Sequence, residues 1–134
     1  MSTSKPRLLL IEIPEVKVTY EIDGKEEVYS AVRTNYPKQS QLIIAGMLRD
    51  LCEVEIIDMK LDDSKREELF KLISYGNGII KCYKVGASFD SIKNKIINSD
   101  IVGLTSNFTR SAGVLTDFIK YIKNTNPKTK IIVG

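Results

Sequence analysis

Histidine is absent from this chain of 134 residues, and its absence restricts the chemistry that the protein can perform. Histidine is the commonest general base in enzymes and a frequent metal ligand, so both roles are removed at once. The two cysteines, Cys52 and Cys82, form no Cys-x-x-Cys motif and predict reduced thiols. There is also no nucleophile elbow, no cysteine triplet for an iron–sulfur cluster and no pair of acids at the end of a predicted strand. We therefore expect no complete catalytic site within these residues.

Glycine-rich phosphate loops are missing as well. No Gly-x-Gly-x-x-Gly follows the first predicted strand and no Walker loop is present, which argues against dinucleotides and nucleoside triphosphates as ligands. The segment after Ile13 also lacks the hydroxyl-rich loop that flavin mononucleotide would need. The amino-terminal apolar run is too short for a signal peptide or a membrane span, so we expect a cytoplasmic protein without a membrane partner.

The composition is that of one globular domain. Hydrophobic residues make up 43% of the chain, which is enough for a core and too much for a disordered segment. The net charge is +3 with 28% charged residues, so the surface carries both signs and no basic stripe for nucleic acid.

Apolar runs alternate with segments of helical period. Each of four short runs has the near-continuous hydrophobicity of a parallel strand buried on both faces. These strands begin at Leu8, Val54, Ile101 and Ile131. Between them, helical spacing predicts helices over 38–51, 88–98 and 111–124. The alternation predicts an α/β fold with a doubly wound parallel sheet. Such sheets usually have a fifth strand, so we expect a domain cut after its fourth core strand, as in an amino-terminal fragment of a larger protein.

Three other segments have simpler signals. Residues 16–29 alternate around Asp23-Gly24, which predicts an inserted hairpin; it is either an edge ribbon, which we favour, or a lid. The capping box that begins at Ser64 predicts a short helix through Ile73. Residues 79–85 are either an edge strand or an extended connector. Asp58, at the end of the second core strand, either caps a turn, which we favour, or approaches a ligand.

The most abrupt change from apolar to polar residues lies between Asp100 and Thr109. Gly103 interrupts the apolar run, as happens where a helix, another backbone or a ligand comes close. Thr105, Ser106 and Asn107 then bring hydrogen-bonding groups to the carboxyl end of the strand, where open α/β sheets bind ligands. Thr109 or Ser111 at a helix N-cap is the simpler interpretation of these polar residues. Both interpretations stand at this point.

Several segments, taken together in order, resemble a known family. They are Tyr36-Pro37 with the helix to Arg49, the strand 53–58, Tyr83–Gly86, and the whole run from Asp100 to Gly134. Their order and spacing resemble the amino-terminal cobalamin (vitamin B12)-binding domain of cobalamin-dependent radical S-adenosylmethionine enzymes. The resemblance covers about three quarters of the chain and leaves residues 16–29 as a local variation.

The resemblance implies a flavodoxin-like (Rossmann-like) fold whose strand ends hold a corrinoid ring. Small residues, Thr105 and Ser106 above the closely packed Gly103, would bind the nucleotide tail or its phosphate. Asn107 and Phe108 would line the lower face of the ring, and Glu12, Ile13 and Pro14 would form the neighbouring wall. Gly134 matches the start of the family's glycine turn.

The chain departs from cobalamin domains that supply a histidine to cobalt through an Asp-x-His-x-x-Gly loop. The resemblance therefore implies a lower cobalt position that is empty or held by water or another non-histidine group, suited to methyl transfer. The iron–sulfur cluster and S-adenosylmethionine would belong to a downstream radical S-adenosylmethionine domain, which is the expected partner. The alternative is a degenerate domain that keeps the fold and serves as a recognition or assembly scaffold without a cofactor.

Overall fold

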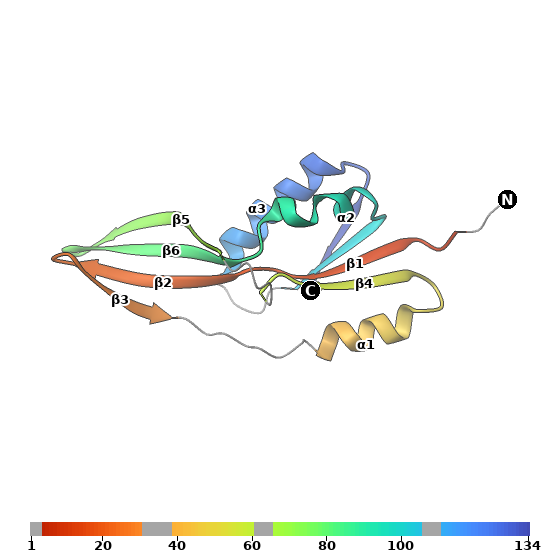
Figure 1. The fold of residues 1–134 in the computed structure, drawn as a ribbon, viewed down its shortest axis with the longest axis horizontal. Helices are drawn as coiled ribbons and strands as arrows, with labels where there is room; N and C mark the ends of the chain where they lie inside the picture. Colours follow the sequence, from red (N-terminus) through yellow and green to blue (C-terminus); the bar gives the residue numbers. More distant parts are fainter. Residues whose placement is uncertain (1–3, 31–38, 61–65, 106–110) are drawn as a thin grey trace.

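The protein is a two-part α/β structure in which a parallel sheet continues into an antiparallel one (Figure 1). The computed structural model describes residues 4–30, 39–60, 66–105 and 111–134. Within these ranges, one sheet has the strand order β4-β1-β7-β8 and the other has the order β3-β2-β6-β5.

The parallel sheet contains all four predicted core strands. They are β1 (Arg7–Glu12), β4 (Glu53–Asp58), β7 (Ile101–Thr105) and β8 (Lys130–Val133). In the centre of the sheet, Leu10 lies beside Ile56 on one side and Gly103 on the other. The prediction of a parallel α/β sheet is thus confirmed.

Helices lie on both faces of this sheet (Figure 1). The first, α1 (Gln39–Leu48), lies on one face, and the 3₁₀ turn η1 (Phe89–Ile92), α2 (Lys93–Ile97) and α3 (Ala112–Thr125) lie on the other. The Asn126 side chain ties the second group together, because its amide donates to the carbonyls of Ile96, Ile97 and Ser99 at the end of α2.

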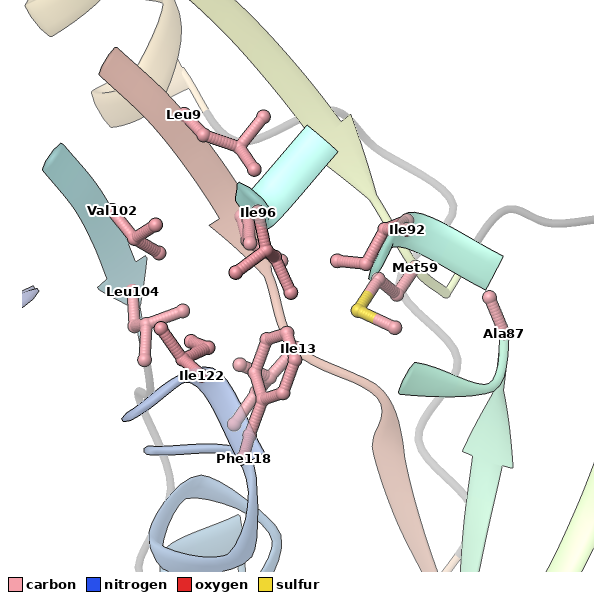
Figure 2. Close-up of a cluster of buried hydrophobic side chains, with 11 residues drawn as sticks. Leu9, Ile13, Met59, Ala87, Ile92, Ile96, Val102, Leu104, Phe118 and Ile122 are labelled. Atoms are coloured by element: carbon pink, nitrogen blue, oxygen red, sulfur yellow. The ribbon is translucent and has the colours of Figure 1, made fainter. Parts of the chain in front are cut away.

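The main hydrophobic core lies between the sheet and the helices α2 and α3 (Figure 2). Alternate residues of β1 point to this side, and Phe118 and Ile122 of α3 are fully buried against them. The Phe89 ring of η1 stacks on Phe118 with ring centroids 4.5 Å apart. The buried cluster consists of Leu9, Ile11, Ile13, Met59, Ala87, Ile92, Ile96, Val102, Leu104, Phe118 and Ile122.

Helix α1 covers its face of the sheet less completely than the sequence predicts. Its only fully buried residue is Gln41, while Leu42, Ile43 and Met47 are 51%, 60% and 75% exposed. The helix is apolar on almost all sides, so packing one side against the sheet leaves much of its apolar surface exposed.

The antiparallel sheet, which we call the arm, extends from the carboxyl end of β1 (Figure 1). Its strands are β2 (Glu15–Ile22), β3 (Lys25–Ser30), β5 (Arg66–Tyr75) and β6 (Gly78–Gly86). Asp23 and Gly24 have φ angles of 51° and 76°, which confirms the predicted hairpin turn. The hairpin is not an edge ribbon of the parallel sheet, because its two strands belong to the antiparallel sheet together with β5 and β6.

The predicted helix beginning at Ser64 is wrong, since residues 66–75 form β5. The apolar residues Leu69, Leu72 and Ile73 fit a helical face and a strand about equally well over so short a distance. Pairing with β6 decides between them, and the strand 78–86 that provides it is an interior strand of the arm rather than an edge strand or a connector.

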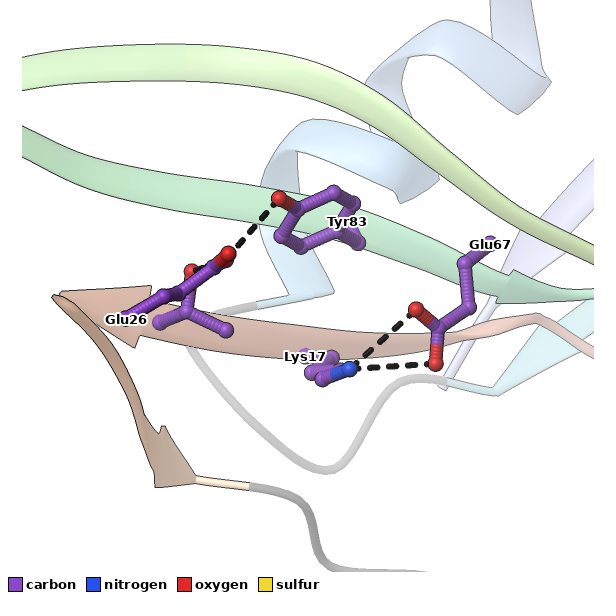
Figure 3. Close-up of polar contacts among 5 residues, drawn as sticks. Lys17, Glu26, Glu67 and Tyr83 are labelled. Atoms are coloured by element: carbon purple, nitrogen blue, oxygen red, sulfur yellow. Dashed lines mark hydrogen bonds and ion pairs between the residues drawn. The ribbon is translucent and has the colours of Figure 1, made fainter. Parts of the chain in front are cut away.

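One face of the arm carries polar and charged side chains (Figure 3). Lys17 bonds to both carboxylate oxygens of Glu67 at 3.1 Å. Glu26 accepts hydrogen bonds from the Thr19 hydroxyl at 2.5 Å and the Tyr83 hydroxyl at 3.0 Å. These bonds, first from Thr19 and then from Tyr83, hold the pKa of Glu26 below its ordinary value of 4.5.

Replacing Glu26 by glutamine should make the stability of the protein less dependent on pH in the acidic range. A carboxylate whose pKa is lowered by folding contributes stability above its unfolded pKa, and this contribution is lost as the pH falls through the folded value. Urea denaturation of wild type and Glu26→Gln at pH 7 and below pH 4.5 measures the difference. Equal pH dependence in both proteins would contradict the assignment; Glu27→Gln, on the same strand, is the control.

Candidate functional site

The carboxyl edge of the parallel sheet contains a topological switch point. From β1 the chain crosses to β4 on one side, and from β4 it returns past β1 to β7 on the other. Connections that leave in opposite directions open a crevice at the strand ends, and ligands of open α/β proteins bind there. The residues at the ends of β1 and β7, Glu12 and Thr105, lie side by side in the sheet register.

Four side chains form a hydrogen-bonded cluster at this edge. The Thr105 hydroxyl donates to Glu12 Oε2 at 2.8 Å, and Gln41 Nε2 donates to Thr105 Oγ1 at 3.4 Å. The other carboxylate oxygen of Glu12, Oε1, lies 3.2 Å from Lys60 Nζ. We call Glu12, Gln41, Lys60 and Thr105 the edge cluster.

The strands and one turn place the edge cluster. Leu8, Leu10 and Glu12 alternate onto the α1 side of β1, so the first polar residue of this row is also the last of the strand. The turn after β4 brings Lys60 back toward Glu12. Asp58 stabilises that turn by accepting the Lys60 backbone N–H at 2.9 Å, which confirms its predicted role as a turn cap.

The ion pair between Glu12 and Lys60 is buried, with 7% and 8% of the side chains exposed. The attraction between the two charges offsets the loss of hydration that burial imposes on each of them, and the Thr105 hydroxyl donates to the second carboxylate oxygen. Removing one partner takes away the opposite charge that lies 3.2 Å from the other, so the edge cluster is sensitive to single substitutions.

Other residues predicted for the site have different surroundings. Ile13 is part of the main core, and Pro14 is fully buried beside Gly86. At Gly103 an added Cβ would lie 2.7 Å from Leu10 Cδ2, so the close neighbour at this glycine is the Leu10 side chain. Gly134 is exposed, and its N–H donates to the Leu104 carbonyl at 3.0 Å.

Part of the predicted polar loop, Ser106, Asn107, Phe108 and Thr109, lies outside the described residues. Ser111 does occupy the N-cap position of α3, without a side-chain hydrogen bond to the helix. The structure therefore brings Glu12 and Thr105 together, and the ligand-binding roles assigned to them from sequence stay predictions.

The sequence interpretation missed two members of the edge cluster, Lys60 and Gln41. Gln41 has a signal that could have been used, because it is the last polar residue before the apolar run of α1. Lys60 follows a strand-ending aspartate, as surface lysines in turns commonly do, and only the tertiary structure shows that its side chain is buried.

Two hollows lie at the amino end of the strands. The first, of about 280 Å³, is lined by charged residues that pair with one another, Arg7 with Glu53 at 3.5 Å and Lys95 with Glu55. The second, of about 580 Å³, lies between Lys5, Arg49 and Cys52. Neither hollow includes a residue of the edge cluster.

Across the described ranges, histidine, cysteine, aspartate and glutamate side chains do not gather in threes as a metal site would require. The helices in the same ranges lack the length and hydropathy needed to cross a bilayer.

Comparisons with protein-family models, with curated proteins and with solved structures found no match to this chain.

Proposed function

We propose that the chain is a flavodoxin-like cobalamin-binding module of a radical S-adenosylmethionine enzyme. The order β4-β1-β7-β8 supports the proposal, because numbering these parallel strands in sequence gives 2-1-3-4, the first four positions of the flavodoxin-like order. The segments that resemble the cobalamin-binding family include three of the four strands of this sheet, β4, β7 and β8.

The observation that carries the proposal is the meeting of Glu12 and Thr105 at the switch point. A corrin ring is rimmed by amide side chains and carries a phosphate-containing tail, so its site needs hydrogen-bonding groups at a sheet edge. The hydroxyl, carboxylate and amide of the edge cluster have this chemistry. Thr105 is half-buried, so its hydroxyl is the group of the pair that a ligand can reach more easily.

In this proposal, Thr105 bonds to the nucleotide tail, and Gln41 and Glu12 fix the orientation of its hydroxyl. Lys60 neutralises Glu12 and so keeps a carboxylate acceptable beside an apolar ring. Bound cobalamin would supply a cobalt centre that carries a methyl group. Because the chain has no histidine, the protein would hold that cobalt without an imidazole ligand.

Mixing the chain with hydroxocobalamin and separating the mixture by gel filtration tests the proposal directly. We expect the visible absorption of the corrinoid to elute with the protein. Absorption that elutes only with the small molecules would contradict the proposal.

Replacing Thr105 by valine should weaken hydroxocobalamin binding by about three- to tenfold, the effect of one lost hydrogen bond. Valine keeps the shape of threonine and removes only the hydroxyl. Spectroscopic titration measures the dissociation constant, and urea denaturation measures the separate effect of losing the bond to Glu12. The matched control is Thr116→Val, whose hydroxyl bonds to the Ala112 carbonyl on α3. Equal affinity of both variants would place the tail elsewhere.

A scaffold without a cofactor is the second candidate, and the exposure of apolar residues on α1 favours it. Leu42, Ile43 and Met47 present apolar surface of the kind that recognition surfaces use. This function predicts a folded chain that does not retain hydroxocobalamin, so the gel-filtration experiment separates the two candidates.

A further inference from the structure

We propose that the outer edge of β5 pairs with β5 of a second copy of this chain, joining two arms into one continuous antiparallel sheet. Strand β5 ends the strand order β3-β2-β6-β5, and in the described part of the chain no strand lies on its outer side. Its outward backbone N–H and C=O groups are therefore placed to bind another strand.

The two edges of the arm differ in how they discourage such pairing. The edge strand β3 begins with Lys25, Glu26 and Glu27, and charged residues on an edge oppose association. Strand β5 has a single charged residue, Lys71, in its second half, Lys71–Tyr75. Leu72, Ile73 and Tyr75 of this half are 58%, 39% and 66% exposed. The association-prone edge is therefore the second half of β5.

A bulge divides β5 into two halves. The register with β6 shifts between Leu69 and Lys71, and the Phe70 ring is directed to the body of the protein, 3.5 Å from the position of a Cβ at Gly113. Beyond the bulge, Lys71–Tyr75 pairs regularly with β6. This regular half is the part that can add a strand without distortion.

The charge pattern of Lys71–Tyr75 selects a second copy running antiparallel. With the two-fold axis at Ile73, Lys71 of one copy lies beside Tyr75 of the other, and Leu72 lies beside Ser74. No like charges meet. Because the inner edge of β5 already pairs with β6, each copy contributes one edge, and the antiparallel pair closes at two copies.

The same register completes an apolar surface on one face of the arm. Ile73 lies in one cross-strand row with Ile80 and Tyr20, and the Tyr20 and Tyr75 rings meet edge to face at 6.4 Å. In the pair, Ile73 and Tyr75 of the second copy extend this surface across the axis. The contact is isologous, so each copy buries the same residues and a closed dimer results.

The test is the molar mass of the 134-residue chain by light scattering, measured over a range up to about 100 μM so that a weak dimer is populated as well as a tight one. We expect wild type to form a dimer. Ile73→Lys places two ammonium groups together at the axis and should raise the dissociation constant by about a hundredfold or more.

Ile22→Lys is the matched control, because Ile22 is 37% exposed against 39% for Ile73 and lies on the same face, away from the β5 edge. It should leave the dimer intact. A monomeric wild type, assemblies that keep growing, or equal behaviour of the two variants would overturn the proposal.

Hydrogen exchange of wild type provides a readout that needs no variant. Amides of Lys71–Tyr75 should exchange more slowly in concentrated than in dilute protein, and unchanged exchange would also overturn the proposal.

Discussion

Replacing Lys60 by methionine should lower the free energy of unfolding by about 3 kcal/mol or more, because the substitution removes the cation that lies beside a buried carboxylate. Glu12 and Lys60 are both almost fully buried and their charged atoms lie 3.2 Å apart. Methionine preserves much of the length and apolar character of the lysine stem, so the lost charge dominates the effect. Urea denaturation followed by circular dichroism measures the change.

Two controls separate charge from packing. In Glu12→Leu/Lys60→Met both charges are removed, and we expect stability within about 1.5 kcal/mol of wild type because a buried pair and an apolar pair are often nearly equal. Lys17→Met breaks the more exposed pair with Glu67 and should cost less than about 1 kcal/mol. If Lys60→Met costs no more than Lys17→Met, the buried pair does not stabilise the edge cluster.

Replacing Gly86 by alanine should also destabilise the protein strongly, by about 3 kcal/mol, at the junction between the arm and the parallel sheet. Gly86 has a φ angle of 145°, and a Cβ there would lie 2.6 Å from the backbone oxygen of Met59. That oxygen accepts a hydrogen bond from the Ala87 N–H at 2.8 Å, so it cannot move aside without losing this bond.

Gly24→Ala is the control for Gly86→Ala, because it separates backbone strain from crowding. Gly24 has a φ angle of 76° and no atom within 4 Å of an added Cβ. Its cost should be the strain alone, about 1 to 2 kcal/mol. Thermal or urea unfolding of both variants gives the difference, and equal costs would show that the Met59 carbonyl does not limit the size of residue 86.

The parallel sheet was predictable because its signal is local. A short apolar run such as Leu8–Ile11 leaves few alternatives to a buried strand, and helical spacing between such runs determines the connections. The strand β5 was not predictable in the same way. Its Ser64 capping box and the spacing of Leu69, Leu72 and Ile73 favour a helix locally, and the competing strand depends on β6, which the sequence presents as ambiguous.

The same difference between local signals and tertiary contacts applies to the residues of the candidate site. Thr105 was predicted at this edge because it ends a core strand, and Glu12 because the family resemblance places it in the neighbouring wall. The register brings the two residues together. At Gly103 the close neighbour is the Leu10 side chain of the adjacent strand, and not a helix, another backbone or a ligand as the sequence suggested. Lys60 could not be found, because its burial depends on the turn that Asp58 stabilises.

The continuity of β1 with β2 has a mechanical consequence. Only Ile13 and Pro14, both buried, separate the two strands, so the arm and the strand that ends in Glu12 form one stiff beam. The return strand β6 is fastened to the same place, because Ala87 bonds to Met59 and Met59 bonds to the Glu12 carbonyl. A force applied at the tip of the arm would therefore be transmitted through these two short connections to Glu12, the residue of β1 at the switch point.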